Sequence, residues 1–393
     1  MKKLTFIFLA LITLRVFAND SAYYASGNQL IPITETDICV TKEVLTIEKK
    51  TVYEQNDAGE TVGKQYFAYV TVDYTFFNPG PEKTILVGFE APSPNGDVDG
   101  TPKNGAHPYI SDFDVNVNSE LLEFKTSIVN TENYYVNNKI NAKTEEEIIN
   151  NGFDQNSPDF YYVYHFNANF KSGLNKITHT YRFNMSGSVM GGYNFDYILT
   201  AANRWGNNQI DDFTLIIDMG ISEIFSMRNT FFDDKSEWKI PYGKCYDSGD
   251  EKTKFITGTG RVIFHKKNFK PKGELYLGSS RDEREYGYPA FDYSIYGLPE
   301  YINSDISSTR SVDENSFKIL RNLPFALRGY VFKTEVIQEY YSSQWWYSPK
   351  PEYKATLDEL SSEEINWLEK VKSNKWDSEY KEDNKTYYRY APY

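Results

Sequence analysis

Apolar and polar side chains alternate along much of the first three quarters of the chain. Over residues 66–76 every even position is apolar or aromatic, whereas the odd positions include Thr71, Asp73 and Thr75. A period of two predicts strands with one buried face. The same alternation returns over residues 85–89, 160–166, 177–183 and 213–217, and residues 261–265 also resemble a strand. Turns rich in Asn, Gly and Pro separate these stretches, so we predict an antiparallel β-sandwich at residues 37–278.

After residue 312 the apolar positions follow a helical period. Between positions 336 and 341 they share one face of a helix that begins at Thr334. A further helix is predicted within residues 360–372, where Ser361 and Glu364 have the spacing of a capping box. The fold class is therefore mainly β with a small α-helical C-terminal module, which we place at residues 313–375.

The N-terminus has the pattern of a signal peptide. Lys2 and Lys3 precede an apolar run that is too short to span a bilayer, and Val16 and Ala18 suit cleavage before Asn19. The alternative is a buried N-terminal strand or helix. We expect an exported protein, periplasmic or extracellular, without a membrane span after cleavage. The expected organisation is a signal peptide at 1–18, a lead-in at 19–36, the sandwich, a connector at 279–312, the module and a tail at 376–393.

Charge excludes two classes of partner. The whole chain has 42 basic and 55 acidic residues, and removal of the predicted signal peptide takes away three basic residues and no acid. The mature net charge is then near −16. Nucleic acid and anionic lipid headgroups both require a basic face, so neither is an expected partner.

Cys39 and Cys245 are the two cysteines of the chain. In an oxidising compartment such a pair can form a disulfide, which would close a loop of roughly 206 residues and contribute at most ~5 kcal/mol. The alternative is two unrelated buried thiols. The sequence leaves both open.

The segment "NGDVDG" at 95–100 resembles the first half of a calcium loop. Asn95, Asp97 and Asp99 occupy ligand positions one, three and five, but Ala106 stands where calcium would need a bidentate acid. We expect an Asx-rich turn there and keep a calcium site as the alternative. The sequence has no other metal-ligand spacing and no cofactor motif, so no cofactor is predicted.

Catalytic signals are sparse. The four histidines are not spaced for zinc, and we expect His179 to be a buried, hydrogen-bonded residue and His165 to be exposed. Serine-nucleophile and phosphate-loop motifs are absent from the sequence. Paired carboxylates could serve a glycosidase, and the candidates are Asp112/Asp114, Asp211/Asp212 and Asp233/Asp234. No catalytic residue is assigned.

Residues 320–372 contain "LRN", "FALRGYVFK", "QEYYSSQWWYSPKPEY" and "LSSEEINWLEKVK". This region resembles the YARHG domain, a module of exported bacterial proteins. The resemblance implies an extracytoplasmic, mostly helical domain of unestablished function. The signature falls on residues 325–329, where Leu327 and Arg328 replace the Arg and His of the family. If the module binds a ligand, we expect Arg328, Trp345, Trp346 and Tyr347 to contact it; the alternative is that the aromatic residues form its core.

The β-rich region is similar to a second family of exported bacterial β-domains. The similarity lies in "VTVDYTFFNPGPEKTILVGFEAP" and "YILTAANRWGNNQIDDFTLIID". It implies a sandwich and no activity. From these patterns we predict a non-enzymatic protein with a binding or structural role at the bacterial cell envelope. Cell-wall glycan, including peptidoglycan, or an envelope protein is the expected partner, and the alternative is a glycan-cleaving hydrolase that uses paired carboxylates.

Overall fold

The computed structural model describes most of the chain, with gaps. The described residues are 22–23, 27, 29–56, 61–96, 98–130, 133–150, 160–187, 192–220, 223–241, 243–257, 261–279, 311–344, 347–373, 378–382 and 385–389. The predicted signal peptide, Asp97, Trp345, Trp346 and most of the predicted connector lie outside them.

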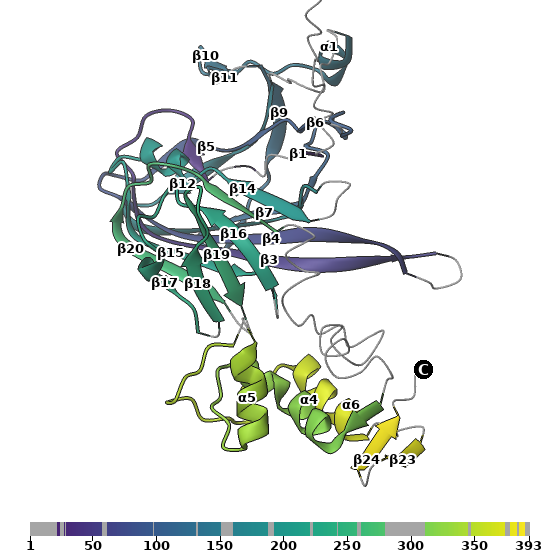
Figure 1. The fold of residues 1–393 in the computed structure, drawn as a ribbon. Helices are drawn as coiled ribbons and strands as arrows, with labels where there is room; N and C mark the ends of the chain where they lie inside the picture. Colours follow the sequence, from purple (N-terminus) through teal and green to yellow (C-terminus); the bar gives the residue numbers. More distant parts are fainter. Residues whose placement is uncertain are drawn as a thin grey trace, which may run out of the picture.

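A large twisted sheet forms one layer of the β-rich part (Figure 1). Its strands, in spatial order, are β17 (Trp238–Lys239), β20 (Val262–Phe269), β15 (Ile210–Asp218), β3 (Cys39–Gln55), β4 (Thr61–Asn78), β13 (Gly173–Asn184), β7 (Ile110–Val117) and β8 (Glu120–Leu121). The apolar positions of the alternating pattern form the buried face of the sheet. In β4, for example, Val70, Val72 and Phe76 are buried.

Two smaller sheets share a core with the large one. One contains β2 (Ile31–Pro32), β5 (Lys83–Pro92), β12 (Tyr161–Phe170) and β9 (Lys125–Val129). The other contains β14 (Tyr193–Tyr197), β21 (Leu275–Ser279), β16 (Glu223–Arg228), β19 (Lys252–Thr257) and β18 (Gly243–Asp247). Side chains of all three sheets form one buried cluster, in which Phe89 of β5 lies 5.0 Å from Tyr181 of β13 between ring centroids. The sandwich prediction is confirmed.

Short elements complete this part of the chain. They are β1 (Ala22–Tyr23) paired with β6 (Asn95–Gly96), β10 (Tyr135–Val136) paired with β11 (Lys139–Ile140), helix α1 (Glu145–Asn150) and the 3-10 turns η1 (Thr200–Arg204) and η2 (Lys235–Glu237).

One strand pair departs from the predicted antiparallel order. Strands β3 and β15 run parallel, from Val40 beside Ile210 to Glu48 beside Asp218. Two parallel neighbouring strands must be joined by a long crossover connection. Between β3 and β15 this connection consists of most of the other strands of the sandwich. Alternation within each strand says nothing about this direction, so the sequence could not distinguish it.

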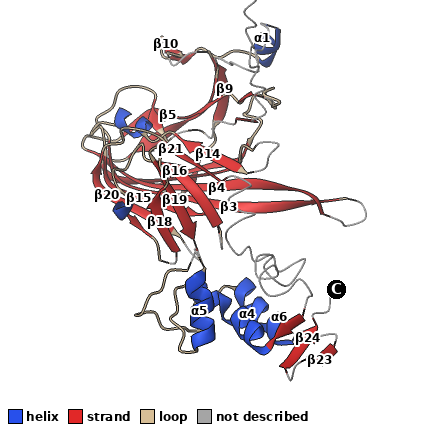
Figure 2. Cartoon of the chain, in the orientation of Figure 1, coloured by secondary structure: helices blue, strands red, loops and turns tan. Residues whose placement is uncertain are grey.

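The C-terminal part is helical, with α4 (Glu314–Leu327), α5 (Glu335–Ser343) and α6 (Ser362–Ser373). Figure 2 shows these helices grouped apart from the strands of the sandwich. A three-stranded sheet accompanies them, made of β22 (Ser311–Asp313), β24 (Lys385–Arg389) and β23 (Ser378–Glu382). The tail was predicted to be loosely held, but its described residues form the strands β23 and β24. Strand β24 also pairs with β22, which precedes α4.

An apolar seam joins the helical part to the sandwich. Ile224 of β16 and Ile256 of β19 are buried in the same cluster as Leu320 and Leu323 of α4. The ammonium group of Lys350 also donates a hydrogen bond to the Pro241 carbonyl of the sandwich. Outward-facing positions of one sheet thus serve as the platform for the helices. Among the described residues no helix has the length and apolarity needed to cross a bilayer.

Candidate functional site

The signature stretch of the helical part turns tightly after α4. Gly329 has φ of +85°, and a Cβ atom at this position would stand 2.3 Å from the Ser348 carbonyl oxygen. The Gly329 carbonyl accepts a hydrogen bond from the Lys350 backbone N–H at 2.8 Å. A glycine is therefore required both by the backbone conformation and by the close approach of the following loop.

Arg328 is buried and makes a bidentate ion pair. Its Nη1 and Nη2 donate to Oε1 and Oε2 of Glu364 at 2.6 and 2.7 Å, and the two residues are 2% and 0% exposed. The same guanidinium donates to the Pro324 and Glu359 carbonyls at 2.8 Å each. Glu364 also accepts from the Ser361 backbone N–H at 2.9 Å, which confirms the predicted capping box. One carboxylate thus starts α6 and fixes the end of α4.

Tyr347 lies in the core of the helical part. It is 8% exposed, and its hydroxyl donates to the Tyr330 carbonyl at 2.7 Å. Arg328 and Tyr347 therefore both make contacts within the module, whereas Trp345 and Trp346 lie outside the described residues. The binding role expected for these four residues stays a prediction.

The two histidines for which the sequence made a prediction, His179 and His165, differ in burial. His179 is fully buried, as expected. Within the described part of the chain neither of its ring nitrogens has a hydrogen-bond partner, so the prediction of a hydrogen bond was wrong. The ring instead stacks on Tyr74 and Tyr181 at 5.9 and 6.0 Å. Burial lowers the pKa of His179 to about 3, and the imidazole is neutral at neutral pH. His165 is half-buried rather than exposed, and its Nε2 lies 3.0 Å from the Ser127 hydroxyl.

The predicted calcium ligands lie in a turn. The Asp99 carboxylate accepts from the Thr101 backbone N–H at 3.0 Å, which is an Asx turn, and Asp97 lies outside the described residues. Within the described ranges no group of three or more His, Cys, Asp and Glu side chains gathers in a way that could hold a metal ion.

The paired carboxylates have structural contacts. Asp112 faces Arg182 at 3.2 Å, Asp212 contacts His265 and Lys267 at 2.8 and 2.6 Å, and Asp234 caps η2. The pKa of Asp212 is lowered by its hydrogen bonds to Lys267 and His265. These are ion pairs and caps at strand and turn surfaces.

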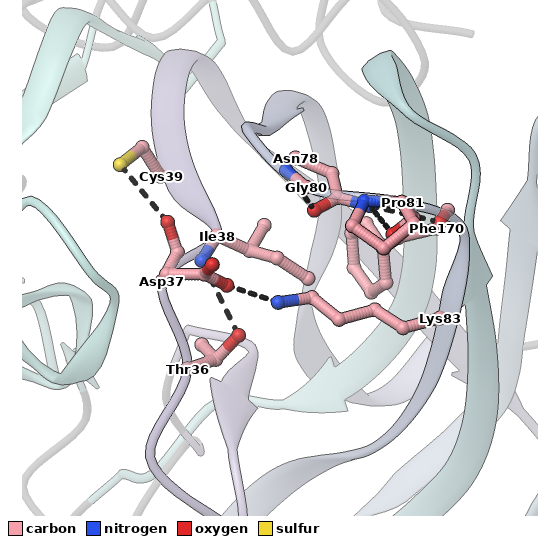
Figure 3. A network of polar contacts seen from close by, with 9 residues as sticks. All are labelled: Thr36, Asp37, Ile38, Cys39, Asn78, Gly80, Pro81, Lys83 and Phe170. Carbon is pink, nitrogen blue, oxygen red and sulfur yellow. Dashed lines mark hydrogen bonds and ion pairs between the residues drawn. The ribbon is translucent and has the colours of Figure 1, made fainter.

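The start of β3 is held by a polar network (Figure 3). Lys83 of β5 donates to the Asp37 carboxylate, and the resulting ion pair lowers the pKa of Asp37. The Cys39 thiol donates to the Asp37 carbonyl at 3.4 Å. Cys39 and Cys245 are free thiols in this structure and lie on different sheets, and the disulfide between them stays a prediction.

Asn78 ends β4 in the same network. Its amide donates to the Pro81 and Phe170 carbonyls at 2.8 and 3.1 Å, and its carbonyl oxygen accepts from the Gly80 N–H at 3.1 Å (Figure 3). This residue is the Asn of the "FFNPG" stretch that resembles the second family, and its role here is to close the turn between β4 and β5.

The sandwich core contains a buried polar pair, Gln29 and Glu43, that was not predicted from the sequence. Gln29 Nε2 donates to Glu43 Oε1 at 2.5 Å, and both residues are 0% exposed. Burial raises the pKa of Glu43 to about 8. A signal existed, because Glu43 alternates with Leu45 and Ile47 and so occupies an inward position of β3.

The β3–β4 hairpin extends past its neighbours. Strand β15 last pairs with β3 at Glu48, and β13 last pairs with β4 at Phe67. Among the described residues no third strand joins the distal part, residues 51–55 and 61–65, which we name the ribbon arm. Figure 1 shows it projecting from the sandwich. Val52 is 46% exposed on this arm.

Comparison with known proteins bears on the helical part. Residues 296–375 match the YARHG domain family. The helical module is a YARHG domain. Its match begins upstream of the predicted boundary at 313, within the predicted connector. YARHG domains are typical of exported proteins. Curated proteins give no match to the chain.

Two solved structures are similar at a distance. One is a Legionella pneumophila protein provisionally described as nutrient binding, with 20% identity, a TM-score of 0.44 and coverage of 90% of this chain and 100% of that one. The other is an M1 zinc metallopeptidase from Deinococcus radiodurans, with 8% identity and a TM-score of 0.26. It aligns with 63% of this chain, which spans 43% of its length. At these TM-scores neither structure bears on the fold or the ligand of this protein.

Proposed function

We propose that the protein is an exported binding protein of the bacterial cell envelope, and that the ribbon arm contacts an envelope protein. The observation that carries this proposal is the projection of the arm beyond the strands that flank the rest of the hairpin. The YARHG domain uses Arg328 within its own core, in the ion pair with Glu364, so we propose the contact at the arm rather than at Arg328.

The physical chemistry of strand edges supports this. A two-stranded ribbon is only marginally stable in water, and its open edges offer backbone N–H and C=O groups to another strand. Natural proteins usually shorten or cover such edges. An arm that keeps them, and that also exposes Val52, suits the addition of a partner strand.

Export is supported by two independent features. The first 18 residues have the signal-peptide pattern, and YARHG domains are typical of exported proteins. Edman sequencing of protein recovered from the bacterium tests the first feature, and it should give Asn19 as the mature N-terminus.

The choice of an envelope protein over wall glycan rests on the chemistry of the arm. Strand addition uses backbone hydrogen bonds along both chains, which a polysaccharide does not offer in register. Glycan recognition would instead depend on stacked aromatic rings and convergent polar side chains. The test below separates these partners.

Purified mature protein is sedimented with envelope vesicles and, separately, with purified peptidoglycan sacculi. The variant Val52→Asp should bind vesicles at least tenfold more weakly, because it places a charge on a surface that becomes covered. The matched control is Val136→Asp, since Val136 is 52% exposed on the short β10–β11 hairpin and should behave as wild type. Equal binding by both variants, or binding to sacculi alone, contradicts the proposal.

A further inference from the structure

A buried strap runs from the lead-in into the sandwich, and we define the strap as residues 29–33. Gln29, Leu30 and Ile31 are each 0% exposed, whereas Glu35, just beyond the strap, is exposed. The strap pairs with the edge of β5 at two positions, so its backbone adds little to that sheet. Side-chain contacts from the sandwich therefore contribute much of what holds the strap in place.

Three side chains of the sandwich form hydrogen bonds with the strap. The Leu30 N–H donates to the Tyr74 hydroxyl at 3.2 Å, and the Leu30 carbonyl accepts from Trp205 Nε1 at 2.8 Å. Gln29 Nε2 donates to Glu43 Oε1 at 2.5 Å. Burial holds the pKa of Tyr74 well above its usual range, and an indole does not titrate, so Glu43 is the partner whose charge can change near neutral pH.

The Glu43 carboxyl group is neutral while the strap is docked. It is 0% exposed, and the ion pairs of the described residues do not include it. The titratable groups around it are uncharged at neutral pH, and they are Tyr74 of β4, His179 and Tyr181 of β13, and Tyr197 of β14. A buried carboxyl group among uncharged neighbours keeps its proton, and burial raises the pKa of Glu43 to about 8.

Release of the strap reverses the protonation of Glu43. Gln29 is the strap residue that contacts Glu43, so departure of the strap leaves the carboxyl group open to water. A hydrated glutamic acid side chain has a pKa near 4.5, and at neutral pH the exposed Glu43 therefore gives its proton to solvent. The strap can return only when the carboxylate takes the proton back, because an unpaired charge is costly to bury.

We propose that the strap is locked by a proton: it docks when Glu43 is protonated, and its opening releases that proton to solvent. A rise in pH through neutrality then favours the open strap. Opening uncovers the edge of β5 beside Gly88, whose backbone groups become available to water or to another strand. This device is independent of the ribbon arm, because the arm belongs to the large sheet and the strap to the sheet that contains β5.

Amide hydrogen exchange of the whole mature chain tests the lock, with rates corrected for the intrinsic effect of pH. The Leu30 and Ile33 amides report opening of the strap, and the amides of β4 and β13 report global unfolding. The opening constant of the strap should rise about tenfold per pH unit from about pH 5 to 7.5, because one proton is released. Between about pH 5 and 6 the global unfolding constant should instead fall as pH rises, because the buried His107 and His179 dominate it.

Two variants assign the released proton to Glu43. Glu43→Gln should make the opening constant of the strap independent of pH, whereas Glu35→Gln removes a carboxylate from an exposed position of the same lead-in and should keep the tenfold dependence. The wild-type measurement needs neither variant. Strap amides that exchange only through global unfolding, or a wild-type opening constant that does not change with pH, overturn the proposal.

Discussion

Arg328 and Glu364 hold each other through two parallel hydrogen bonds of 2.6 and 2.7 Å, and both side chains are buried in the YARHG domain. The pair joins the end of α4 to the start of α6. It also changes the meaning of the signature stretch, because the arginine that the sequence suggested as a ligand contact is occupied by the domain's own carboxylate.

Removal of one partner should destabilise the domain strongly. We expect Arg328→Ala to lower the unfolding free energy of the YARHG domain by about 3–5 kcal/mol, because it leaves Glu364 buried and unpaired. Arg321→Ala, at an exposed position of the same helix, should cost less than about 0.5 kcal/mol. Chemical denaturation of the whole chain, with hydrogen exchange to locate the loss, measures both. A folded Arg328→Ala protein that loses only a partner would make this residue a binding site.

Alanine substitution at Gly329 and at Gly249 separates the cost of steric crowding from the cost of a left-handed backbone conformation. Gly329 and Gly249 have similar φ values, +85° and +82°, but only Gly329 lies against neighbouring atoms, since nothing stands within 4 Å of a Cβ at Gly249. Gly249→Ala should cost about 1 kcal/mol from the left-handed conformation alone. Gly329→Ala should cost clearly more, because the methyl group meets the Ser348 carbonyl. Equal losses in urea denaturation would show that the loop gives way.

Stability should depend on pH through three buried groups. Burial raises the pKa of Glu43 from 4.5 to about 8 and lowers those of His107 and His179 from 6.5 to about 3. From pH 4.5 to 8 the folded chain keeps the Glu43 proton and the unfolded chain loses it, so this group lowers stability as pH rises. Below pH 6.5 the unfolded chain takes up the two histidine protons, so these groups lower stability as pH falls.

Two histidines outweigh one glutamate between pH 4.5 and 6.5, so the protein should be most stable near pH 6.5. The loss of stability between pH 6.5 and 8 should be about 1–2 kcal/mol. Glu43→Gln should remove this alkaline loss and steepen the acidic limb between pH 4.5 and 6.5, where Glu43 opposes the two histidines. A wild-type profile that is flat from pH 6.5 to 8 would contradict the assignment of a neutral Glu43.

The seam between the YARHG domain and the sandwich should open when it receives a charge. Ile256 is 0% exposed and packs in the cluster that contains Leu320 and Leu323. Ile256→Asp buries an unpaired carboxylate there, so we expect the domain to leave the sheet and the radius of gyration to rise in small-angle X-ray scattering. Ile216→Asp, at a half-buried position of the large sheet, is the control. An unchanged radius for Ile256→Asp would show that the apolar seam does not hold the two parts.

Local patterns predicted local structure well. Alternation located strands such as β4 and β13, and the spacing of Ser361 and Glu364 located the start of α6 with its capping box. Thr334 does precede α5, although its side chain makes no capping hydrogen bond. These features depend on residues close together in the chain, which a sequence displays directly.

Contacts between residues far apart in the sequence were not predicted. The parallel alignment of β3 with β15, the pairing of the tail with β22, and the contact of Gln29 with Glu43 each join residues whose proximity is created by the fold. Glu43 could have been noticed as a charged residue at an inward strand position. Its partner Gln29 could not, because that contact depends on how the lead-in crosses the sandwich.

The central claim is that the ribbon arm binds an envelope protein, and site-specific photo-crosslinking in living cells tests it most directly. A photoreactive amino acid replaces Val52 in one strain and Val136 in another, and both proteins are expressed at the native level. The account predicts one discrete protein adduct from position 52 and none from position 136. The absence of a protein adduct at position 52, or the same adducts from both positions, would contradict it.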